Sequence, residues 1–211
     1  MHNFFTRHAA ATWSHQARVH IYAVGNDALR KTFASYHKAL KESGVAAAHG
    51  LGLQPPEWAH FTVQMTLRAR HEVPHAQLDE LVEKLRGAVA PLPALTLRVG
   101  APQASRHAVE LAVEPTMDAQ WHDMAMVVRG AVTDVFGAQA LPEPGPNMVP
   151  HTSIGYGIAD GDSGTITSTL QTVRIAPVEV PITALHLVAV QQHRDQGQFT
   201  WDHLAELPLT G

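Results

Sequence analysis

The chain has 211 residues, 45% of them hydrophobic, with a formal net charge of −4. This size and apolar content are typical of one large domain or of two small lobes. The acidic balance argues against a protein that grips long nucleic acid by its backbone, which needs clustered lysine and arginine. Cysteine is absent, which excludes disulfides, thiol nucleophiles and cysteine-ligated zinc.

The N-terminal stretch shows no targeting signal of the secretory type. No apolar run in the chain approaches the roughly 18 residues of a membrane span, and residues 1–17 lack the apolar core of a signal peptide. Arg7 and Arg18 precede the first acid, Asp27, which is a feature that transit peptides share. We expect residues 1–17 to form a short arm packed on a single domain, 1–211, of a cytoplasmic, monomeric protein without membrane contact.

Hydrophobic periodicity predicts alternating strands and helices along the rest of the chain. Alternating or continuous apolar runs predict strands at 18–24, 95–99, 107–113, 181–191 and 199–207. Apolar residues at helical spacing and capping residues predict helices at 27–43, 75–90, 116–136 and 164–173. The run 181–191 is continuously apolar, so we expect it to be one strand buried on both faces. The absence of a flexible linker favours one compact α+β unit of two lobes.

Two short motifs stand out against this background. Each reads His-x-Thr/Ser within a strand-like stretch, at His60 and Thr62 and again about ninety residues later at His151 and Ser153. Because successive side chains in a strand point to opposite faces, each imidazole shares a face with the hydroxyl two residues on. Two imidazoles and two hydroxyls are enough to hold a phosphate and to move two protons around it. The spacing predicts one cleft lined by both motifs.

In their spacing and flanking elements, the two motifs resemble the 2H phosphoesterase superfamily. The branch that includes the bacterial 2′-5′ RNA ligases, also called RNA 2′,3′-cyclic phosphodiesterases, is the most similar, and the likeness spans about 18–209. This resemblance implies a bilobal, pseudo-twofold α+β fold, with two antiparallel-rich sheets facing across a central cleft and helices outside. It also implies that His60, Thr62, His151 and Ser153 are catalytic, and that the protein needs no metal or other cofactor.

The same resemblance implies the substrate class. We expect a cyclic phosphodiesterase, with possible 2′-5′ RNA ligase activity, acting on 2′,3′-cyclic phosphate or 2′-5′ phosphodiester ends. The partner would be a small nucleotide or an RNA end, not a long nucleic acid tract. Gln64 and Trp58 share the parity of His60 and are candidates for substrate binding, and Arg68 could steer a phosphate. Tyr156 has the opposite parity and is expected in the core.

Two other classes of function remain open. A binding module would hold a nucleotide or RNA end with little turnover. A metal-dependent hydrolase would use some of the 15 histidines as ligands. The sequence contains neither a helical histidine pair with a nearby acid nor an acidic cluster, which disfavours this second alternative.

Overall fold

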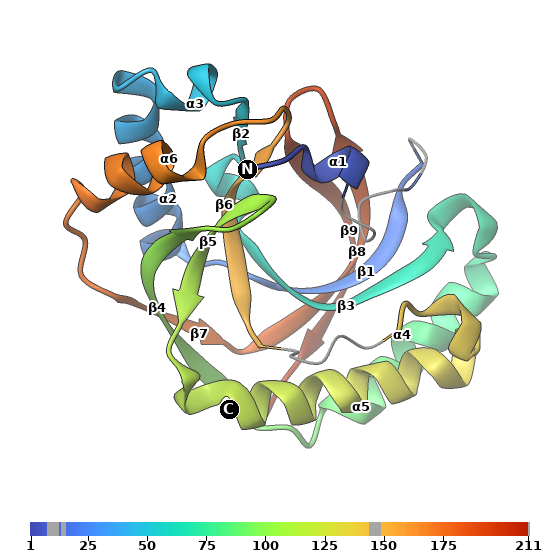
Figure 1. Cartoon of the computed structure of the whole chain (residues 1–211). Coiled ribbons are helices and arrows are strands. Elements are labelled where there is room, and N and C mark those ends of the chain that lie inside the picture. The colour runs from blue at the N-terminus through green and yellow to red at the C-terminus, as the bar shows by residue number, and fades with distance from the viewer. Residues whose placement is uncertain (8–12, 14–15, 144–148, 211) are drawn as a thin grey trace.

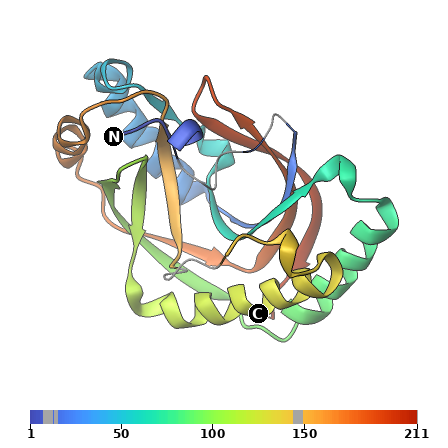
Figure 2. The same ribbon diagram turned by 45° about the vertical axis from the view of Figure 1, so that its right-hand side comes forward.

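The computed structural model describes residues 1–7, 13, 16–143 and 149–210. Two sheets dominate the fold, and the strands paired within them run antiparallel. The four-stranded sheet has the order β3-β1-β8-β9, and the five-stranded sheet has the order β2-β6-β5-β4-β7. In Figures 1 and 2 the four-stranded sheet curls around a central space, with the five-stranded sheet opposite it. The expected fold class is confirmed.

The bounds of the elements follow the predicted periodicity in most places. The four-stranded sheet consists of β1 (Arg18–Val24), β3 (His60–Ala69), β8 (Ala184–His193) and β9 (Gln198–Pro208). The five-stranded sheet consists of β2 (Leu51–Leu53), β4 (Leu95–Ala104), β5 (Ala108–Val113), β6 (His151–Gly157) and β7 (Val178–Ile182). The helices are α1 (Phe4–Arg7), α2 (Asp27–Glu42), α3 (Val45–Ala48), α4 (His75–Val89), α5 (Asp118–Phe136) and α6 (Ser163–Gln171). Short 3-10 turns lie at η2 (Pro56–Trp58), η3 (Arg70–Glu72), η4 (Pro115–Met117) and η5 (Ala138–Ala140).

The helices cover the outer faces of the two sheets. Helices α4 and α5 pack on each other and against β9 and β3, while α2 and α6 pack against β7 and β4 (Figure 1). Helix α2 shows why: Leu29, Phe33 and Leu40 form one fully buried stripe, and the Asn26 side chain caps its N-terminus by accepting from the Leu29 amide at 3.0 Å. The inner faces of the sheets are thereby left to face each other. None of the described helices is both long and apolar enough to cross a membrane.

The expected single strand at 181–191 is wrong. This stretch contains the end of β7 and most of β8, which belong to different sheets, and only Thr183 separates the two strands. Both strands are rich in apolar residues, so periodicity alone gave no sign of the break. The strand predicted at 95–99 also continues further, because β4 extends to Ala104, and residues 105–107 connect it to β5.

In both motif strands the pairing with a neighbouring strand is irregular just after the motif. The pairing of β3 with β1 passes over Val63, and the pairing of β6 with β5 passes over Ile154. Each skipped residue comes three positions after the motif histidine. A bulge of this kind interrupts the strict alternation of side chains. Parity arguments therefore hold for the histidine and the hydroxyl of each motif but not beyond them.

Candidate active site

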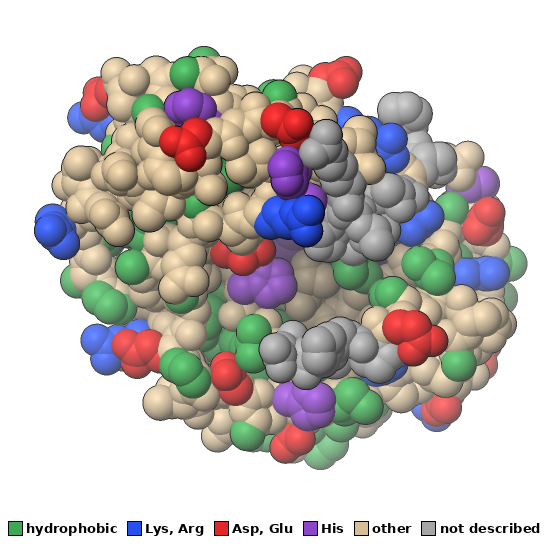
Figure 3. All heavy atoms as spheres, in the orientation of Figure 1, with side chains coloured by type: hydrophobic (Ala, Val, Ile, Leu, Met, Phe, Trp, Pro, Cys, Tyr) green, Lys and Arg blue, Asp and Glu red, His purple; other side chains and the backbone are tan. Residues whose placement is uncertain are grey.

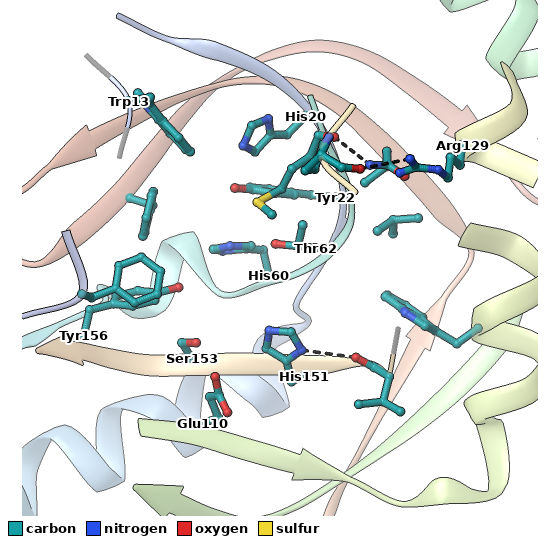
Figure 4. A pocket seen from close by; sticks show the side chains of 18 of the residues that line it. Trp13, His20, Tyr22, His60, Thr62, Glu110, Arg129, His151, Ser153 and Tyr156 are labelled. Carbon is teal, nitrogen blue, oxygen red and sulfur yellow. Dashed lines mark hydrogen bonds between the residues drawn. The ribbon is translucent and has the colours of Figure 1, made fainter. Parts of the chain in front are cut away.

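A cavity of about 390 Å³ is lined by residues from both sheets. His60 and Thr62 of β3 lie on one side of it, and His151 and Ser153 of β6 lie on the other (Figure 4). In the space-filling view, the centre of the face is hollowed, with histidine at the edge of the hollow (Figure 3). The volume is within the usual range for small-molecule sites. The structure thus brings the two motifs to one cavity, as their spacing predicts.

The two imidazoles are held in the same way. Nδ1 of His60 donates to the carbonyl of Trp58 at 2.9 Å, and Nδ1 of His151 donates to the carbonyl of Val149 at 3.2 Å. Each carbonyl belongs to the residue two positions earlier. Because a carbonyl oxygen can only accept, Nδ1 carries the proton in both rings. In its neutral form each ring is therefore left with an unprotonated Nε2.

The environments of the two rings differ. His60 is buried, with 6% of its surface exposed, whereas His151 is exposed. Burial lowers the pKa of His60 to about 4; the Trp58 carbonyl opposes this shift, and the nearby His151 adds to it. At neutral pH His60 is therefore uncharged.

A tyrosine supports each motif hydroxyl. Tyr22 of β1 is hydrogen-bonded to Thr62, and Tyr156 of β6 is hydrogen-bonded to Ser153. Burial raises the pKa of both phenols far above the usual value, so both tyrosines stay protonated at neutral pH. The hydroxyl of each motif is therefore fixed by a second, neutral hydroxyl. Tyr156 is buried in an apolar cluster, as expected, and beyond the bulge at Ile154 it also lines the cavity.

Sequence reasoning missed several residues of the cavity wall. Glu110 of β5 pairs with Ser153 in register, and Arg129 of α5 lines the cavity while its guanidinium donates to the Pro142 carbonyl at 3.0 Å. Arg129 follows the apolar stripe of its helix, and nothing in the local sequence distinguishes it from a solvent-exposed arginine. Tyr22 could have been found, because an antiparallel pairing of the first strand with the His60 strand places it opposite Thr62.

The three residues proposed for substrate binding lie in different places. Gln64 lines the cavity and is buried, with its amide donating to the Met65 carbonyl at 2.7 Å. Trp58 is outside the cavity lining: it precedes β3, in η2, so the parity of the strand does not apply to it, and its ring packs on Trp201 with centroids 4.7 Å apart. Arg68 is also outside the lining, with its guanidinium 5.9 Å from the ring centroid of Phe136.

Among the residues that the structure describes, no group of three or more His, Asp or Glu side chains is placed to hold a metal ion. Glu110 is the carboxylate beside Ser153 in the cavity, and it lies with the two histidines in the same lining. The imidazoles themselves are bound to backbone carbonyls rather than to carboxylates.

The fold and the paired motifs define a class of proteins with two His-x-Thr/Ser motifs in one cavity. The comparisons with known proteins identify the family. The sequence model of the 2′-5′ RNA ligase superfamily matches residues 27–194, and the chain belongs to this family. This membership supports a phosphoesterase-type or ligase activity. Comparison with curated protein sequences found no significant match.

Solved structures with the same fold cover nearly the whole chain. TT0787 of Thermus thermophilus superposes with a TM-score of 0.67 at 16% identity, covering 92% of this chain and 98% of its own. E. coli LigT complexed with 3′-AMP superposes with a TM-score of 0.63 at 16% identity, covering 93% and 99%. The PDE domain of MHV ns2 superposes with a TM-score of 0.50 at 10% identity, covering 83% and 99%. At these identities the likeness establishes the fold.

Proposed function

We propose that this protein is a phosphoesterase that opens 2′,3′-cyclic phosphates, or cleaves 2′-5′ phosphodiester ends, by general acid–base catalysis with His60 and His151. One observation carries the proposal. Both rings bind a backbone carbonyl through Nδ1, two residues before each ring, and both line one cavity with a hydroxyl beside them. Such a pair can place one imidazole on each side of a phosphorus, so that one ring accepts a proton and the other donates one.

The difference in burial suggests which ring is the base. In hydrolysis, Nε2 of neutral His60 takes a proton from a water whose oxygen attacks phosphorus. The bond from phosphorus to one ribose oxygen breaks, and protonated His151 gives its proton to that oxygen. His151 suits the charged role because it is exposed and loses less hydration when it carries a proton. In ligation a 5′-hydroxyl would take the place of the water, and each ring would keep its role; in the reverse cleavage of a 2′-5′ linkage the two roles would exchange.

The hydroxyls would act on the phosphate itself. Thr62 and Ser153 lie beside the two rings and can donate to the non-bridging oxygens as negative charge builds there. Each hydroxyl is hydrogen-bonded to a tyrosine that stays neutral. The tyrosines therefore add no negative charge that would repel the phosphate. Acid, base and charge stabilisation are then all supplied by side chains, and we expect activity without added metal.

The comparisons support a nucleotide as the substrate. E. coli LigT, which shares the fold, has been solved with 3′-AMP, with phosphate, with NADP⁺ and with ATP. A cavity of about 390 Å³ is of a size to hold a small nucleotide or the end of an RNA. The net charge of −4 disfavours a long RNA tract.

The decisive experiment is a hydrolysis assay on 2′,3′-cyclic AMP in EDTA, followed by addition of Mg²⁺, Mn²⁺ or Zn²⁺. We expect a nucleoside monophosphate product in EDTA and little change on adding metal. Activity that requires metal would instead indicate a metal-dependent hydrolase. Nucleotide binding without turnover under all these conditions would indicate a binding module.

A further inference from the structure

One end of the cavity is built almost entirely from rings. We call this the aromatic end and define it by Phe4, Trp13, His20, Tyr156 and Phe199, all of which line the cavity. Trp13 meets His20 edge to face with ring centroids 5.3 Å apart, and Phe4 lies 4.8 Å from Tyr156. In Figure 4, Trp13 and His20 form the upper part of this end and Tyr156 forms its lower part.

The N-terminal arm supplies part of the aromatic end. Phe4 belongs to α1, and the side-chain amide of Asn3 donates at 2.5 Å to the carbonyl of Ile158, the residue after β6. Trp13 is buried, its carbonyl accepts from the Arg194 guanidinium, and its ring lies 4.9 Å from the guanidinium carbon of Arg18. These contacts are made with residues in or next to strands of both sheets, and Phe4 and Trp13 both line the cavity.

Two buried nitrogens at this end have no hydrogen-bond partner within the described part of the chain. They are Nε1 of Trp13, 4% exposed, and Nε2 of His20, 1% exposed. A buried polar group without a partner costs free energy, and such groups are rare in native proteins. Two of them beside the same cavity point to a ligand that completes their hydrogen bonds.

The tautomer of His20 decides whether its Nε2 donates or accepts a hydrogen bond. Nδ1 of His20 is 2.6 Å from the Val19 carbonyl and 3.4 Å from the Thr66 amide. The shorter contact requires a proton on Nδ1, because a carbonyl cannot donate. Burial lowers the pKa of His20 to about 4, so the ring is neutral at pH 7 and Nε2 is an acceptor. Trp13 Nε1 is always a donor.

We propose that the aromatic end binds the nucleobase of the substrate, with Trp13 donating to a base acceptor and His20 accepting from a base N–H. This inference rests on the proposed function and names the part of the substrate that the motifs leave unassigned. Heterocyclic bases stack on aromatic rings and present donors and acceptors side by side on one edge. Adenine, guanine, cytosine and uracil all offer such an edge, so we expect a preference for a base over no base rather than a strong choice among the four.

The position of this end suits a nucleoside cyclic phosphate. A row of neighbouring rings connects the aromatic end to the first motif: the ring centroid of His20 lies 5.9 Å from that of Tyr22, which lies 4.1 Å from that of His60. A phosphate between the two histidines would therefore have its ribose near Tyr22 and its base near His20. The two unpartnered nitrogens then gain partners when the substrate binds.

The test compares ligands with and without a base in Trp13→Phe and His20→Phe. Trp13→Phe keeps an aromatic ring but removes the N–H together with one of the two fused rings. We expect it to weaken binding of 3′-AMP, measured by calorimetry, by roughly fivefold to tenfold, the usual worth of one hydrogen bond. Binding of inorganic phosphate should not change. With 2′,3′-cyclic AMP the loss should appear in KM, and turnover of ribose 2′,3′-cyclic phosphate should be unaffected.

His193→Phe is the matched control, because His193 is on β8, does not line the cavity and bonds Thr200 instead. An equal loss with both kinds of ligand would make Trp13 merely structural and overturn the proposal, as would no loss or no binding of 3′-AMP by the native protein. If His20→Phe does not fold, Trp13→Phe decides alone. Failure of the proposed function looks different: 3′-AMP would still bind in a Trp13-dependent way, but no cyclic phosphate would be hydrolysed.

Discussion

Tyr22 lies flat against His60, with ring centroids 4.1 Å apart and planes inclined by only 16°. The same tyrosine is hydrogen-bonded to Thr62. One side chain from the neighbouring strand therefore fixes both the plane of the imidazole and the position of the hydroxyl. Trp201 contacts both stacked rings edge to face, with its centroid 5.1 Å from that of His60 and 5.3 Å from that of Tyr22. The His60 ring is therefore held by Tyr22, by Trp201 and by its Nδ1 hydrogen bond to the Trp58 carbonyl.

Substitution of Tyr22 should separate these two contributions. Tyr22→Phe keeps the stacked ring and loses only the bond to Thr62, so we expect kcat to fall a few-fold. Tyr22→Leu also removes the flat partner of His60, and a misplaced general base should lower kcat by roughly tenfold to a hundredfold. Steady-state kinetics with 2′,3′-cyclic AMP measures both. Equal activity of the two variants would contradict the role of stacking.

Removal of either imidazole should abolish most turnover. His60→Ala and His151→Ala should each lower kcat by about 10²-fold or more, the usual contribution of a general acid or base. The double variant should be little worse than either single variant, because the pair acts as a unit. Thr62→Ala and Ser153→Ala should be milder, since each removes one donor to the phosphate. The two-histidine mechanism would not survive a folded single variant with nearly native activity.

The pH dependence of hydrolysis should reflect the burial of His60. An unperturbed pair of imidazoles would place the optimum between about pH 5.5 and 7.5. Since burial lowers the pKa of His60 to about 4, the neutral base persists to lower pH, and the acid limb of kcat/KM should move toward pH 4 to 5. Both limbs report the coupled pair.

This profile is measured as kcat/KM from pH 4 to 9 in buffers with EDTA, on protein shown to be folded at each pH. A flat profile would exclude a pair that needs one neutral and one protonated ring. An acid limb near 6.5 would show that the lower pKa of the pair is not depressed, and the argument from burial for His60 as the base would then fail.

Buried imidazoles should also make stability depend on pH. His20 and His60 both have a pKa lowered to about 4 by burial, against about 6.5 for the exposed group. Between these values the unfolded chain binds protons that the folded protein does not, so the free energy of unfolding should fall as pH decreases from 6.5 to 4. Each ring could contribute up to roughly 3 kcal/mol. Above about pH 7.5 this contribution should not change.

Urea unfolding at pH 4.5, 5.5, 6.5 and 7.5 measures this slope. His20→Phe, which removes one of the two groups, should flatten it, whereas His193→Phe should leave it unchanged. An identical slope in the native protein and His20→Phe would show that His20 binds its proton equally in both states.

The sequence was sufficient for most of the secondary structure and for the position of the two motifs. Amphipathic helices such as α2 and α4 have long periodic stripes, so their bounds agree with the prediction to within a few residues. The break at Thr183 was not predictable, because apolar strands of two different sheets adjoin there and a single threonine, a common strand residue, is all that separates them. Sheet membership depends on distant contacts that periodicity does not encode.

The wall of the site was less accessible to sequence reasoning than its two motifs. His60 and Thr62 precede the bulge at Val63, and the same order holds around Ile154, so parity worked for the motif residues and failed for Tyr156. Arg129 comes from a helix, where it resembles any other surface cation. Trp13 comes from the arm, and no periodic pattern connects it to the strands it contacts.

The two halves of the sequence are not the two halves of the molecule. Helix α2 follows a strand of the four-stranded sheet but covers the five-stranded one, and α5 follows β5 but packs on β3 of the other sheet. Strands β8 and β9 then return to complete the sheet that β1 began. A chain severed between the motifs would give two fragments that each lack strands or covering helices for both sheets. Each half of the chain therefore supplies strands or helices to both sheets, and neither motif can reach its place in the cavity without the other half.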